Sequence, residues 1–114
     1  MLPSMPEDDL AFVVNARSGG RRGRDLLADL RRHFPADRVL DLHQGDLLAA
    51  VQAWRGSCRA VVACGGDGTV AAVLEAVGSD TQVAVGIIPL GTGNDLARHA
   101  RVDLGLPWRT QADR

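Results

Sequence analysis

The chain has 114 residues, a hydrophobic share of 46% and a formal net charge of -1, which together allow one compact domain with its own core. No run approaches the ~20 apolar residues of a membrane span, and the acidic N-terminus lacks the basic-then-apolar order of a secretory signal. Every basic residue is an arginine, which excludes a phosphate loop of the Walker type and any catalytic lysine.

The predicted elements begin after residues 1–9, which we expect to be a disordered lead. Residues 10–15 are a short, nearly all-apolar run, which is typical of a strand buried on both faces. A loop rich in glycine and arginine follows. Residues 38–42 predict a second strand. Between the loop and this strand, Pro35 ends a helix whose apolar face consists of Leu26, Leu27, Leu30 and Phe34.

The second half of the chain repeats this alternation of strands and helices. A helix ending near Gly56 precedes a predicted strand at 60–64, and a helix ending at Gly78 precedes a strand at 83–88. After Pro89, the run LGTGNDLARHA predicts a turn and a last helix, with Asn94 or Asp95 as its N-cap. The apolar faces of the first two of these helices are Leu47, Leu48, Val51 and Trp54, then Val70, Val73, Leu74 and Val77.

Strands that alternate with helices indicate a three-layer α/β/α fold with a mainly parallel sheet and helices on both faces. Ligands of such sheets bind beyond the carboxyl ends of the strands. Three loops leave predicted strands at that edge, at 15–24, 65–69 and 89–95. Each combines glycines with small hydroxyl or amide side chains, so its backbone N–H groups are suited to binding phosphate.

Asp67 is the unusual residue of the second loop, because phosphate would repel a carboxylate placed directly beside it. Three roles are open for it: to reach phosphate through Mg²⁺, to orient or deprotonate an attacking hydroxyl, or to bond to backbone N–H groups and shape the loop. Thr69 is expected to cap the helix that follows.

The remaining polar residues give weaker indications. Arg21, Arg22 and Arg24 predict either a solvated charged face or a contact with a nucleotide phosphate or an anionic lipid surface. The cysteines are expected to be free thiols of a reducing cytoplasm. A zinc site is not expected, because no histidine has a second ligand at helical spacing. These residues are Cys58, Cys64, His33, His43 and His99.

The motifs CGGDGTV and GIIPLGTGNDLAR resemble the catalytic domain of diacylglycerol kinases and the related sphingosine and ceramide kinases. The first loop is similar too, since Asn15-Ala16-Arg17-Ser18-Gly19 keeps the family's Asn-Pro-x-Ser-Gly except for the proline. NAD kinases and phosphofructokinases share Gly-Gly-Asp-Gly-Thr, but the motif at 89–98 is more particular to diacylglycerol kinases. The resemblance covers about residues 10–107 and leaves 108–114 as a tail.

This resemblance implies a Rossmann-like, ATP-binding kinase domain of the NAD kinase and diacylglycerol kinase type. The implied enzyme is a transferase of lipid metabolism and phospholipid biosynthesis, which uses Mg²⁺ to transfer the γ-phosphoryl group of ATP to a lipid hydroxyl such as that of diacylglycerol. Asp67 becomes the leading catalytic candidate, and no metal ligand is assigned. The implied nucleotide contacts are Asn15, Ser18, Gly19, Gly65, Gly66, Asp67, Gly68, Thr69, Gly91, Thr92, Gly93 and Asn94.

Family members carry a second, β-rich domain, and their active site lies in the cleft between the two domains. The resemblance therefore implies a cytoplasmic nucleotide-binding half with peripheral membrane contact in a longer parent, no nucleic-acid partner, and little turnover alone. Ala71 and Ala72 stand where bacterial members have Asn-Glu. Three alternatives stay open: a small-molecule kinase related to NAD kinase or phosphofructokinase, a nucleotide-binding module without catalysis, and a structural fragment that binds no ligand.

Overall fold

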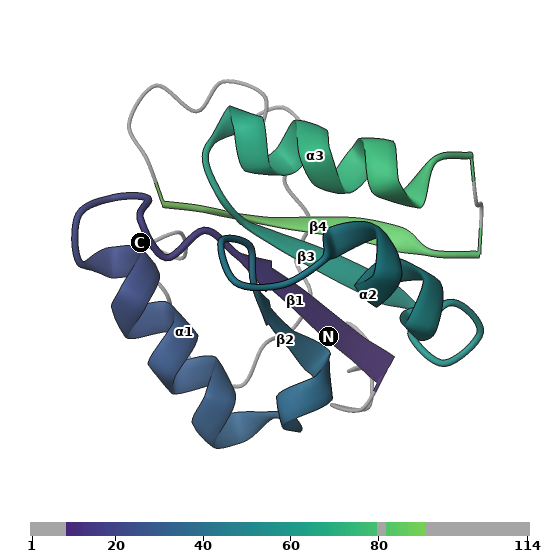
Figure 1. The fold of residues 1–114 in the computed structure, drawn as a ribbon, viewed down its shortest axis with the longest axis horizontal. Coiled ribbons are helices and arrows are strands. Elements are labelled where there is room, and N and C mark those ends of the chain that lie inside the picture. The colour runs from purple at the N-terminus through teal and green to yellow at the C-terminus, as the bar shows by residue number, and fades with distance from the viewer. Residues whose placement is uncertain (1–8, 80–81, 91–114) are drawn as a thin grey trace, which may run out of the picture.

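Four parallel strands form the centre of the structure, a computed structural model that describes residues 9–79 and 82–90 (Figure 1). Their order across the sheet is β2-β1-β3-β4, so the first strand of the chain lies inside the sheet. All three pairings are parallel. The strands are β1 (Leu10–Val14), β2 (Val39–Asp41), β3 (Ala60–Gly65) and β4 (Ala84–Pro89).

Helices cover both faces of this sheet, which confirms the predicted three-layer fold. α1 (Arg22–His33) packs on one face, and α2 (Leu47–Trp54) and α3 (Asp67–Val77) pack on the other. Figure 1 shows α1 and α3 on opposite sides of the strands. A short 3₁₀ helix, η2 (Ala36–Arg38), which the sequence pattern did not predict, leads into β2.

The two faces of the sheet carry separate hydrophobic clusters, because successive side chains of a strand point to opposite faces. Phe12 of β1 and Val62 of β3 are fully buried under α1, beside Leu30. Their neighbours Val13 and Ala63 are fully buried on the other face, under α2 and α3. Strands buried on both faces read as continuous apolar runs, which is why the sequence revealed them.

Two leucines assigned to apolar helix faces are exposed instead. Leu48 is 62% exposed and Leu74 is 44% exposed. Their predicted packing is wrong because each follows a core-facing residue by one position, about 100° around the helix. The residues of α3 that do pack against the sheet are spaced by three or four, at Val70, Val73 and Val77.

The predicted helix ends are confirmed where the structure describes them. α1 stops before Phe34 and Pro35, and α3 stops at Gly78, whose φ of 66° suits a residue without a Cβ. The last predicted helix, which Asn94 or Asp95 was expected to cap, lies outside the described residues, and so do residues 1–8 of the expected lead. Within the described ranges, no helix is long and apolar enough to cross a bilayer.

Candidate functional site

The strand order places a topological switch point between β1 and β3. β1 continues into α1 on one face, whereas β3 continues into α3 on the opposite face. The chain therefore leaves these two neighbouring strands in opposite directions, which opens a crevice at their carboxyl ends. The loop 15–21 and the turn 65–68 border this crevice, so the structure brings together two of the three predicted loops.

Asn15 connects the ends of three different segments at this edge. Its Nδ2 lies 3.4 Å from Thr69 Oγ1 of α3, a long hydrogen bond that it donates. Its Oδ1 accepts from the backbone N–H of Arg17 at 3.1 Å and contacts His43 Nε2 at 2.7 Å. Because a carbonyl oxygen only accepts, His43 must donate through Nε2. One amide thus links the loop after β1, the turn after β2 and the first turn of α3.

The glycines of the motifs divide into two kinds. A Cβ on Gly65 would overlap the Thr69 side chain, and a Cβ on Gly19 would overlap the backbone carbonyl of Leu90. These two glycines let the chain pack closely against itself. Gly66 and Gly68 face open space, since a Cβ there would have no heavy atom within 4 Å. Only the second kind leaves room for a ligand to approach the backbone.

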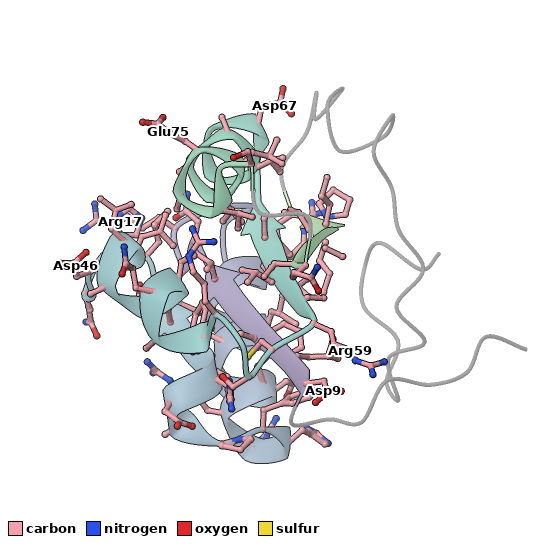
Figure 2. All side chains as sticks on the ribbon, turned by 90° about the vertical axis from the view of Figure 1, so that its right-hand side faces the viewer. Asp9, Arg17, Asp46, Arg59, Asp67 and Glu75 are labelled. Carbon is pink, nitrogen blue, oxygen red and sulfur yellow. The ribbon has the colours of Figure 1, made fainter. Side chains whose placement is uncertain are left out.

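Asp67 is the first residue of α3 and its side chain is exposed. Figure 2 shows the carboxylate projecting outward from the helix. Within the described ranges it makes no hydrogen bond or ion pair, so the loop-shaping role considered for it has no contact to support it. A carboxylate at this position is favoured by the partial positive charge of the helix N-terminus.

Thr69 is not the N-cap of α3. That position belongs to Gly66, and Thr69 lies in the first helical turn with only 3% of its surface exposed. The prediction was wrong because the helix begins at Asp67, directly after the glycine pair. The hydroxyl of Thr69 instead faces Asn15, as described above.

The third loop is described only at its start. The backbone N–H of Leu90 donates to the carbonyl of Gly65 at 3.1 Å, and Leu90 also lies against Gly19. These contacts bring the beginning of the third loop to the other two. The predicted contacts Gly91, Thr92, Gly93 and Asn94 lie outside the described residues.

A sequence model of the diacylglycerol kinase catalytic domain matches residues 9–112. The chain belongs to this family. It is 42% identical to diacylglycerol kinase 1 of Drosophila melanogaster over 84% of this chain, and 40% identical to human diacylglycerol kinase theta over 89% of it. The matches cover 9% and 12% of those two proteins, so the chain spans about a tenth of their length.

The fold of this diacylglycerol kinase family member also matches a solved structure. A Bacillus anthracis str. Sterne protein described as a diacylglycerol kinase aligns with a TM-score of 0.60 and 26% sequence identity. The alignment covers 93% of this chain and 39% of the bacterial chain. Family membership and fold therefore agree with the resemblance inferred from the glycine-rich motifs.

One polar residue at the edge was missed by sequence reasoning. His43 was assigned no role, yet it contacts Asn15 from the turn after β2. The signal available was its position directly after a predicted strand, at the same edge as Asn15. Using that signal required the strand order, because only the placement of β2 beside β1 brings the two side chains together.

The described residues suit a divalent cation held jointly with phosphate oxygens, but not one held by protein alone. No group of three His, Cys, Asp or Glu side chains in the described ranges is placed to hold a metal. Mg²⁺ commonly binds through one or two carboxylates together with substrate phosphates. The exposed carboxylate of Asp67 beside two open glycines meets that requirement.

Proposed function

We propose that this chain is the ATP-binding part of a lipid kinase, which transfers the γ-phosphoryl group of ATP to a lipid hydroxyl such as that of diacylglycerol. The observation that carries the proposal is the exposed Asp67 between the open glycines Gly66 and Gly68, at the switch point of the sheet. Membership of the diacylglycerol kinase family supports the reaction class.

The chemistry of phosphoryl transfer fits what this edge offers. A bond forms between the lipid oxygen and the γ-phosphorus as the bond to the β-phosphate oxygen breaks, and catalysis depends on positioning and charge neutralisation. Backbone N–H groups at the start of α3 are oriented toward an incoming phosphate. Beside this edge, hydrogen bonds to the backbone of Arg17, to His43 and to Thr69 hold the side chain of Asn15 in place.

Asp67 has two roles compatible with its position. Its carboxylate can hold Mg²⁺ against the phosphates, or it can accept the proton of the attacking hydroxyl. When bound, Mg²⁺ would neutralise the charge of the phosphate oxygens. The two roles differ in their consequence for binding, since only the first makes nucleotide affinity depend on the metal through Asp67.

The chain alone is expected to phosphorylate no lipid. The crevice is open to solvent on the side of Gly66 and Gly68, and no described segment covers it. A kinase site must exclude water and hold its acceptor. Turnover therefore needs a second wall, which we assign to the β-rich domain of a longer parent. Lipid phosphorylation by the purified 114-residue protein would contradict this part of the proposal.

The test of nucleotide binding is an NMR titration of the ¹⁵N-labelled chain with ATP, with and without Mg²⁺. We expect chemical-shift changes at residues 65–69 and 15–20 that saturate at millimolar ATP. An absence of changes at these loops up to several millimolar ATP would overturn the proposal.

Asp67→Asn distinguishes the two roles of the carboxylate. The amide keeps the size of the side chain but removes its charge. If Asp67 holds the metal, the variant binds ATP equally with and without Mg²⁺. If it acts as a base, Mg²⁺ still strengthens ATP binding, and the loss appears only in turnover of the two-domain parent. Glu75→Gln is the matched control, because Glu75 is an exposed carboxylate farther along the same helix (Figure 2).

A further inference from the structure

The outer edge of β4 carries backbone groups that have no partner among the described residues. β4 lies at the end of the sheet and pairs with β3 alone (Figure 1). The N–H of Ala84 donates to the carbonyl of Arg59, just before β3, at 2.8 Å, and the N–H of Leu90 donates to the last residue of β3 at 3.1 Å. Hydrogen-bonding groups alternate in direction along a strand, so those of Val85 and Ile87 point away from β3.

The burial of this edge makes its open groups costly. Ile87 is 5% exposed and Val85 is partly buried. Backbone N–H and C=O groups that are removed from water are almost always hydrogen-bonded in native proteins. The edge of β4 therefore requires a partner that supplies both donors and acceptors, which is what another strand does.

The opposite edge of the sheet differs, because β2 has three residues and its outer side is partly bonded by neighbouring turns. The N–H of Val39 donates to the carbonyl of Ala36, and the carbonyl of Asp41 accepts from the N–H groups of Gln44 and Gly45. β4 has six residues, no charged side chain and a proline only at its end. Little in its sequence therefore protects it from pairing with a further strand.

We propose that β4 pairs with β4 of a second copy of this chain. The two strands run antiparallel about a two-fold axis and join the two sheets into one. Val85 of each copy exchanges a pair of hydrogen bonds with Ile87 of the other copy. The partial positive charge of every outward N–H of these residues faces the partial negative charge of a C=O. The edge is thus complementary to itself, as a two-fold contact requires.

Gly86 and Pro89 fix the register of this pairing. With Val85 opposite Ile87, the Gly86 residues of the two copies face each other as a non-hydrogen-bonded pair, in which the Cα atoms approach to about 4.5 Å. Glycine suits such a close approach of two backbones. Pro89 has an outward position but no N–H, so a register shifted toward it loses a hydrogen bond in each half.

The dimer leaves both candidate ATP sites accessible. Because the two copies of β4 run in opposite directions, the carboxyl ends of the two sheets lie at opposite ends of the assembly. The inference does not rest on the proposed function, since it uses only groups at the β4 edge. One pair of strands buries less than the ~1,200–2,000 Å² of a standard stable interface, so we expect a weak dimer.

The experiment measures the mass of the 114-residue chain and the exchange of its amide protons at several concentrations. Sedimentation equilibrium from about 10 μM to about 1 mM should show a shift from monomer to dimer. Over the same range, hydrogen exchange followed by NMR should show protection of Val85 and Ile87 rising by about tenfold or more. Gly86 and Ile88, whose N–H groups point toward β3, should be protected equally at every concentration.

Two variants at one position separate the hydrogen bond from the side chain. Val85→Pro and Val85→Ala both remove the valine side chain, but only proline also removes the outward N–H. We expect Val85→Pro to raise the dissociation constant of the dimer by about tenfold or more, and Val85→Ala to change it by less than about threefold. Circular dichroism checks that both variants fold. If Val85→Pro does not fold, the exchange pattern of the wild-type chain decides.

The proposal is overturned if the chain stays monomeric up to about 1 mM, or if the two variants dimerise equally well. It is also overturned if a dimer forms while the protection of Val85 and Ile87 stays unchanged, because the contact then lies on another surface. Full protection of these two amides at the lowest concentration would overturn it as well, since a segment of the same chain would then pair with β4.

Discussion

Asn15 is the residue on which the edge of the sheet depends most. Its amide group contacts His43, the backbone of Arg17 and Thr69, and these three lie after three different strands. A side chain with these contacts fixes the positions of its neighbours, and it would also position a ligand bound at this edge. His43 and Thr69 act here through Asn15, so we assign them a positioning role rather than a direct one.

The contrast between the packed Gly65 and the open Gly68 predicts that alanine will affect stability differently at the two positions. Gly65→Ala should lower the free energy of unfolding by about 1–3 kcal/mol, because the new Cβ overlaps the buried Thr69. Gly68→Ala should leave the fold intact or stabilise α3 by up to about 1 kcal/mol, since its Cβ would face open space. Urea unfolding measures both changes.

The Gly68→Ala variant should bind ATP more weakly although its stability is not reduced. Gly68→Ala places a methyl group where we propose that phosphate approaches the backbone, so its affinity for ATP should fall while the variant stays folded. If Gly68→Ala binds ATP as tightly as the wild-type chain, phosphate does not bind at this glycine.

A prediction about pH follows from the buried cysteines. Burial raises the pKa of the Cys64 thiol above its ordinary value of 9.0, and burial also raises that of Cys58, partly opposed by Arg38. Above pH 9 the unfolded chain therefore loses thiol protons before the folded chain does. Stability should fall as pH rises, by up to roughly 1.4 kcal/mol per pH unit for each thiol.

This alkaline effect can be measured cleanly, because the sequence contains no lysine and no tyrosine. The cysteines are then the side chains that titrate between pH 9 and 10.5. Urea unfolding across that range should show a falling free energy for the wild-type chain and a flat one for the Cys58→Ala, Cys64→Ala double variant. Equal slopes for the two proteins would contradict the assignment.

At the scale of the elements, much of the fold could be predicted from the sequence. Three of the four strands, β1, β3 and β4, are nearly continuous apolar runs, and glycine or proline marks the ends of α1 and α3. The start of α1 was not indicated by the sequence pattern. The helix begins at Arg22 with a polar turn, which precedes its apolar face. The contact between His43 and Asn15 could not be predicted either, since it depends on strand order.

The C-terminal end of α3 is hydrogen-bonded by a side chain from outside the helix. Arg55 Nη2 donates to the carbonyls of Ala76 and Val77, at 3.2 Å and 3.1 Å, where the helix lacks its own donors. Arg55→Ala should destabilise the chain by about 1 kcal/mol. Arg59→Ala, which removes only an exposed ion pair with Asp9, should change stability by less than about 0.5 kcal/mol.

Thermal unfolding at neutral pH compares these two arginine variants. A smaller loss for Arg55→Ala than for Arg59→Ala would mean that the helix end is not stabilised by the guanidinium group. The comparison removes one positive charge in both cases, so a difference between them reports the local contacts of Arg55 rather than net charge.

At the scale of the whole molecule, the two clusters share one sheet, so we expect them to unfold together. β1 and β3 contribute alternate residues to both clusters, and neither cluster can lose its strands alone. A small domain of this kind unfolds as a single cooperative unit.

Trp54 offers a probe for that expectation. It is buried in α2, and its Nε1 donates to the carbonyl of Asp37 at 2.8 Å. In a Trp108→Phe background, urea unfolding followed by Trp54 fluorescence should have the same midpoint as unfolding followed by far-ultraviolet circular dichroism. A fluorescence midpoint at lower urea would show that the α2 side opens separately.

The parallel pairing of β1 with β3 also sets when the edge that carries Asn15 can form during synthesis. The paired strands are about 50 residues apart in the chain, from Leu10 and Ala60 onward. At a translation rate of about 5–20 residues per second, β1 waits roughly 3–10 s for its partner to be made. During that interval β1 can pair only with the short strand β2, which is made earlier. The nascent chain is therefore most exposed to chaperones and to aggregation before Gly65 is made, and the edge that carries Asn15 cannot be complete before that point.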